Sequence, residues 1–154
     1  MNLISQELTP YEQREELEKL LIERNYEKIG ELPGIKILEK PRITTFDCLA
    51  YVSNYLKDPR ILENENMLYL YPKDFFRERR YQNVKTPEEG IIVAYHFNSI
   101  INSLKWGVTP GAQHLDLIKN SKVNSKWGKT FIYEHDLNAV PECYGNLVSF
   151  FKKI

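Results

Sequence analysis

The chain has 154 residues, the length of one ordinary domain with room for a hydrophobic core. Hydrophobic residues make up 42% of it and charged residues 27%, a composition that excludes a disordered chain. The 21 basic and 21 acidic residues cancel to a formal net charge of +0, so we expect no nucleic-acid partner. A local basic patch at Arg77, Arg79 and Arg80 is the feature that would favour one.

The sequence also bears on the compartment and on cofactors. No apolar run approaches the roughly 20 residues of a membrane-spanning helix, and residues 1–7 lack the pattern of a signal peptide. We therefore expect a cytoplasmic protein with no membrane partner. Its two cysteines, Cys48 and Cys143, lie far apart in sequence and are predicted to be free thiols. Without closely spaced metal ligands, no structural zinc and no other cofactor is predicted.

The first predicted element is an amphipathic helix from Pro10 to Ile29. Thr9 and Glu12 form a capping box around its first residue, and Gly30 ends it. Its apolar residues fall near one face: Leu17, Leu20, Leu21 and Tyr26. We interpret residues 1–40 as an N-terminal helical extension and residues 44–151 as the core of one domain that spans residues 1–154.

A second helix is predicted from the Thr44-Thr45-Phe46-Asp47-Cys48 segment to Leu56. The threonines suit its N-terminal cap, and Asp58-Pro59 ends it. This helix places Cys48 in its first turn. Between the two helices, residues 35–38 suggest one short strand. After the second helix, residues 72–81 suggest a short helix that begins at a proline.

From Gly90 onward the pattern changes to β-branched and aromatic runs separated by tight turns. The predicted strands are 91–97, 114–118, 122–127, 130–133 and 147–151. Helices followed by strands with short connections predict an α+β domain, in which N-terminal helices pack on an antiparallel β-sheet.

Cys48 and His114 are the residues that could carry chemistry. A thiol at a helix N-terminus faces unpaired backbone N–H groups and the positive end of the helix dipole, which favour the thiolate. The same N–H groups can hold the oxyanion that forms when a thiolate attacks an acyl carbon. Such a site also needs an imidazole within hydrogen-bonding reach and a polar group that orients the imidazole.

The order of these parts resembles the papain-like fold in its compact NlpC-type form. In that family an acidic residue precedes the nucleophile at a helix start, as in Asp47-Cys48, and the base histidine opens a core strand, as in His114-Leu115-Asp116. The third polar residue lies on the strand after a tight turn, which corresponds to Ser125. The later Ser125-Lys126-Trp127-Gly128, His135-Asp136 and Tyr144-Gly145 motifs are also similar to those of a group of uncharacterised bacterial proteins.

The resemblance implies a cysteine hydrolase or acyltransferase that acts on a peptide or small amide. Cys48 would be the nucleophile, His114 the general base and then acid, and Ser125 the orienter of the imidazole. The alternative is a catalytically inactive papain-like module that binds a protein partner. Leu49-Ala50, in place of the family's small residues, and the weak orienter Ser125 favour it.

Two further histidines are weighed against His114. His96 ends an apolar strand and is a rival base, although the resemblance places no catalytic group there. His135 lies between Glu134 and Asp136, so we interpret it as a solvated turn residue or a helix cap.

Overall fold

The computed structural model describes residues 7–23, 35–39, 48–57, 80–97, 112–128, 130–145 and 147–154. Its helices are α1 (Pro10–Glu23), α3 (Cys48–Leu56) and the short 3-10 helix η3 (Glu142–Tyr144). Its strands are β1 (Ile35–Glu39), β2 (Tyr81–Val84), β3 (Ile92–His96), β4 (Ala112–Lys119), β5 (Lys122–Lys126), β6 (Ile132–His135) and β7 (Leu147–Lys153). Neither α1 nor α3, the two α-helices in these ranges, is long and apolar enough to cross a membrane.

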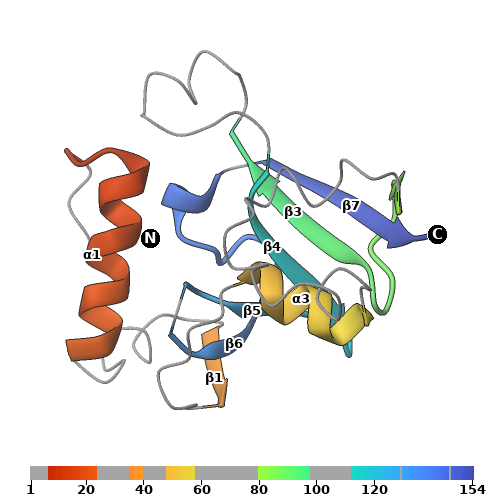
Figure 1. Ribbon diagram of the computed structural model, residues 1–154, viewed down its shortest axis with the longest axis horizontal. Helices are drawn as coiled ribbons and strands as arrows, with labels where there is room; N and C mark the ends of the chain where they lie inside the picture. Colours follow the sequence, from red (N-terminus) through yellow and green to blue (C-terminus); the bar gives the residue numbers. More distant parts are fainter. Residues whose placement is uncertain are drawn as a thin grey trace.

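All the strands join one antiparallel sheet in the order β1-β6-β5-β4-β3-β7-β2. Strands β3 to β6 form a meander, β7 returns to the free side of β3, and β1 and β2 close the two edges (Figure 1). The predicted α+β class and the antiparallel sheet are therefore confirmed.

The turn between β4 and β5 fixes which side chains share a face. Asn120 and Ser121 both have positive φ, 53° and 64°, as a tight two-residue hairpin turn requires. The register then places Leu117 opposite Asn124. Because alternate residues of a strand point to opposite faces, Asp116 and Ser125 lie on the same face of the sheet.

β4 is paired unequally with its two neighbours. It pairs with β3 from Ala112 to Leu117, but with β5 only from Leu117 to Lys119. The N-terminal half of β4, which carries His114, therefore has no recorded strand partner on the β5 side within the described residues. Helix α3 contacts both β4 and β5, and it lies in front of these strands in Figure 1.

Apolar side chains fill both faces of the sheet. On one face, Leu49 and Val52 of α3 pack against a cluster of strand residues, namely Ile92, Ala94, Leu115, Leu117 and Tyr81. On the other face, Leu17 and Leu21 of α1 pack against a larger and more aromatic cluster that includes Tyr95, Trp127, Tyr133 and Tyr144. Strand alternation places His114 and Asp116 on this second face.

Helix α1 is capped as the sequence predicted. The Glu12 backbone N–H donates to Thr9 Oγ1 at 3.3 Å, and the Thr9 hydroxyl donates to the Glu12 carboxylate at 2.8 Å. The helix extends to Glu23 in the described chain, and residues 24–34 lie outside it. Leu17 and Leu21 are each 1% exposed and α1 contacts η3, so the helix is docked on the sheet domain.

The structure differs from some of the sequence expectations, and others fall outside its described residues. Tyr81, expected to end a short helix, instead begins strand β2, where it pairs with Lys153 of β7; residues 72–79 of that predicted helix lie outside the described ranges. The predicted cap residues 44–47 and the basic residues Arg77 and Arg79 also lie outside the described ranges. The strand expected at 130–133 is β6 and runs two residues later, which moves His135 from a turn into the sheet.

Gly145 joins η3 to β7 in a conformation that other residues rarely adopt. Its φ is 114°, and a Cβ atom added there would lie 2.6 Å from the His96 backbone. Only a glycine lets the chain pass this close to β3. The close passage places η3, and with it Tyr144, beside the same face of the sheet as His114.

The packing of α1 against the sheet can be tested by truncating one buried and one exposed aliphatic side chain of the helix. We expect Leu17→Ala to lower the free energy of unfolding by about 2–5 kcal/mol, because it leaves a cavity in the core. Ile22, on the same helix, is 46% exposed, and Ile22→Ala should cost no more than about 1 kcal/mol. Urea denaturation measures both values. Equal, small losses would contradict the docked position of α1.

Candidate active site

Cys48 is the first residue of α3, so the predicted position in the first helical turn is observed. Its thiol is free, and the residue is 8% exposed. Leu49, which follows it, is fully buried among the apolar residues between α3 and the sheet. Leu49 therefore packs into the core beneath α3.

His114 lies near the start of β4 and is 1% exposed. The Tyr144 ring packs against its imidazole with the two ring centres 4.4 Å apart, and Tyr95 lies at 5.9 Å on the neighbouring strand. A hydrogen bond with Cys48 is among the interactions that raise the pKa of His114. The structure therefore brings Cys48 and His114 close together, although 65 intervening residues separate them in the sequence.

Asp116 is the acidic partner of His114. It lies two residues further along β4, on the same face, and its Oδ1 is 2.6 Å from His114 Nε2. The contact is short in distance but poor in angle, so neither atom makes a well-aligned hydrogen bond within the described structure. Both side chains are almost completely buried. The attraction is therefore mainly that of opposite charges in a medium of low dielectric constant.

The environment of His114 favours its charged form. Burial lowers the pKa of the imidazole, but the charges of Asp116 and Cys48 and the close contacts with both side chains outweigh it and raise the pKa to about 10. His114 is thus an imidazolium at neutral pH. Because the folded pKa lies above the ordinary 6.5, this group stabilises the fold fully below pH 6.5, and the contribution is lost as pH rises through about 10.

Ser125, predicted to orient His114, is bonded to a different histidine. Its hydroxyl lies 2.8 Å from Nε2 of His135, and both residues are buried. His135 is only 1% exposed, so its interpretation as a solvated turn residue was wrong; it stands in β6, where the aromatic cluster covers it. His135 Nε2 also lies 3.6 Å from Asp116 Oδ2, so this second pair adjoins the first.

The N-terminal helix contributes a side chain to this region. Arg14 of α1 donates from Nε to the Cys143 carbonyl at 2.9 Å, and its guanidinium lies 5.3 Å from the centre of the Tyr144 ring. Burial lowers the pKa of Arg14, while the charges of Tyr144, Cys143 and Cys48 act in the opposite direction. Arg14 is therefore close enough to Cys48 for their charges to interact.

The remaining candidates lie apart from this arrangement. His96 Nε2 is 3.0 Å from Ser149 Oγ on β7. Cys143 is 2% exposed, and burial raises the pKa of its thiol to about 11, which keeps it protonated at neutral pH. Among the described residues, no three His, Cys, Asp or Glu side chains are grouped as a metal site requires.

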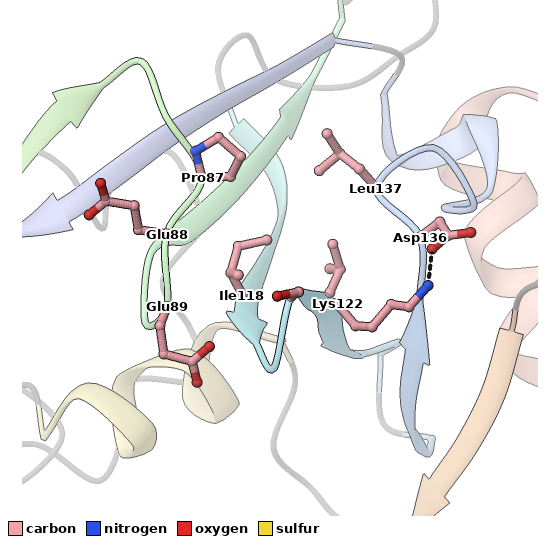
Figure 2. Close-up of a pocket in the computed structure, with 9 residues that line it drawn as sticks. Pro87, Glu88, Glu89, Ile118, Lys122, Asp136 and Leu137 are labelled. Carbon is pink, nitrogen blue, oxygen red and sulfur yellow. Dashed lines mark hydrogen bonds and ion pairs between the residues drawn. The ribbon is translucent and has the colours of Figure 1, made fainter.

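A surface pocket lies beyond the end of β6 and is built from turns. Figure 2 shows Pro87, Glu88 and Glu89 on one side and Asp136 and Leu137 on the other, with Lys122 reaching across to Asp136. This exposed ion pair lowers the pKa of Asp136, through the hydrogen bond from Lys122 and then its charge.

Asp116 and His135 are the site residues that the sequence analysis missed. Asp116 had a readable signal, because a carboxylate two residues after a strand histidine must share its face. His135 had none, since its neighbours Glu134 and Asp136 are charged and predict exposure.

Comparison of the chain with protein-family models, with curated proteins and with solved structures finds no match.

The charge state of His114 is open to direct measurement. We expect NMR of labelled imidazole nitrogens to show His114 still protonated at pH 8 in the unmodified protein. In Asp116→Asn the ring should be neutral at that pH. Burial still lowers the pKa of His114 in this variant, but the negative charge of Asp116 that raised it is gone. A His114 ring that loses its proton near pH 6.5 in the unmodified protein would contradict the buried ion pair.

Proposed function

We propose that the protein is a papain-like cysteine hydrolase or acyltransferase that acts on an amide or peptide bond. The observation that supports this most is the position of His114, which lies within reach of both the Cys48 thiol and the Asp116 carboxylate. A nucleophile, a base and an acidic group in contact in that order are the parts that covalent acyl transfer needs.

The first half of the reaction forms a thioester. The Cys48 thiolate attacks the carbonyl carbon of the substrate, and the negative charge moves to the carbonyl oxygen. The Cys48 backbone N–H, at the start of α3, is placed to donate to that oxygen. The His114 imidazolium then gives its proton to the leaving nitrogen, the C–N bond breaks, and the amine departs.

The second half returns the enzyme to its starting state. His114, now neutral, takes a proton from water as the water oxygen attacks the thioester carbon. The C–S bond breaks, the acid product leaves, and Cys48 is again a thiolate beside an imidazolium. If an amine or alcohol replaces water, the same steps give acyl transfer.

Asp116 acts through His114. Its carboxylate stabilises the imidazolium of the free enzyme, and it holds the ring in position through the 2.6 Å contact. Since Asp116 is fully buried, water does not screen this charge. We assign it the role that the family resemblance gave to Ser125.

The substrate class follows from access to the sulfur. Cys48 exposes 8% of its surface, so the acyl group that reaches it must be slender, such as an extended peptide or a small amide. The same low exposure favours a second candidate, an inactive module that keeps the fold and binds a protein partner. We propose a cytoplasmic setting for either function.

Alkylation of the two cysteines by iodoacetamide separates these functions. We expect Cys48 to react at least about tenfold faster than Cys143 at pH 7, because an adjacent imidazolium favours the thiolate. Cys143, whose pKa is about 11, should react measurably only at strongly basic pH. Mass spectrometry of the digested protein gives both alkylation rates. The Cys48→Ala variant shows which labelled peptide belongs to Cys48.

Variants of the partners test the arrangement. His114→Gln and Asp116→Asn should each remove much of the rate advantage of Cys48 at pH 7, while His96→Gln should leave it unchanged, since His96 is bonded to Ser149. If Cys48 and Cys143 react at equal rates from pH 5 to pH 9, the thiol is not activated, and the interaction module is the better description.

A further inference from the structure

The Ser125–His135 pair defines the protonation of a second buried histidine. His135 Nδ1 lies 2.7 Å from the backbone carbonyl of Asp136, an oxygen that can only accept. Nδ1 must therefore carry the proton. Burial, the largest influence, lowers the pKa of His135, so the ring is neutral and Nε2 holds a lone pair. Ser125 then donates its hydroxyl proton to Nε2 across 2.8 Å.

This tautomer determines which group His135 presents to the Oδ2 atom of Asp116. His135 Nε2 is 3.6 Å from Asp116 Oδ2, but it offers a lone pair and no proton. Asp116 receives no well-aligned hydrogen bond from His135 or from any other described residue. The negative charge of Asp116 is therefore compensated by His114, whose Nε2 lies 2.6 Å from Asp116 Oδ1.

We propose that Ser125 and His135 are positioning residues that keep Asp116 paired with His114 at neutral pH and withdraw it when His135 takes up a proton. A protonated Nε2 would present an N–H and a positive charge to Asp116 Oδ2. Two imidazolium rings would then compete for one carboxylate. The support that Asp116 gives to the His114 imidazolium, and with it the activation of Cys48, would then weaken on acidification. The inference deepens the proposed function and rests on it for the reactivity measurement.

Charged groups from several strands face or adjoin His135. Asp116 and Asp136 favour the charged ring, and His114 opposes it. Lys36 of β1, Lys122 of β5 and Glu134 of β6 line a shallow surface pocket beside His135. Lys122 is paired with Asp136 (Figure 2). Asp116, which is fully buried, is the charge that a newly protonated Nε2 would meet inside the protein.

The test compares two histidines that make the same contact in different places. His135 Nε2 bonds Ser125 Oγ at 2.8 Å, and His96 Nε2 bonds Ser149 Oγ at 3.0 Å, away from Asp116. We would measure the pH at which Cys48 alkylation falls to half of its neutral value. His135→Gln, which keeps an acceptor for Ser125 but cannot be protonated, should move this midpoint to lower pH, and His96→Gln should not.

Ser125→Ala should move the midpoint the other way, by about half a pH unit or more, because the neutral ring loses its hydrogen-bond donor. A merely structural pair would lower the rate without opposite shifts of the midpoint. An unchanged midpoint in both His135→Gln and Ser125→Ala would overturn the proposal.

Nitrogen NMR of the unmodified protein tests the inference without a reactive thiol. We expect His135 to show a protonated Nδ1 and an unprotonated Nε2 at pH 7, and Nε2 to gain its proton at higher pH in Ser125→Ala. A His135 that carries its proton on Nε2 at pH 7 would overturn the positioning role. If the NMR result holds but Cys48 proves unreactive, the proposed function fails and the buried histidine pair stands.

Discussion

The buried carboxyl group of Asp116 is the constraint on which the rest of the site depends. A charge removed from water costs several kcal/mol unless a partner of opposite charge compensates it. Asp116 is fully buried and has no well-aligned hydrogen bond within the described chain, so His114 must supply the compensation as an imidazolium. That requirement raises the pKa of His114 and places an imidazolium beside Cys48.

The elements that exclude water from this pair come from distant parts of the chain. Tyr144 of η3 covers the His114 ring, and Gly145 lets η3 approach β3 closely enough to do so. Helix α1 packs its leucines into the same face and brings Arg14 to the edge of the site. The extension that sequence patterns set apart from the core therefore contributes to the environment of His114 and Cys48.

Much of the fold could be read from local patterns. The capping box at Thr9, the helix start at Cys48 and the strand runs after Gly90 each reflect a short-range preference of the backbone, and the structure contains each of these elements. The strand β2 was not anticipated, because its residues pair with β7, which lies more than sixty residues later. Its stability comes from that pairing and not from its own composition.

The candidate site divides in the same way. By itself the sequence determined that Cys48 lies in the first turn of a helix and that His114 stands on a strand, because helix caps and strand runs are local properties. Strand alternation also implied that Asp116 shares the face of His114, although its role was not foreseen. Only the tertiary structure decided that Cys48 meets His114, that Ser125 serves His135, and that His135 is buried between charged neighbours. These outcomes depend on how α3 crosses β4 and on the register of β4 to β6, which are set by long-range packing.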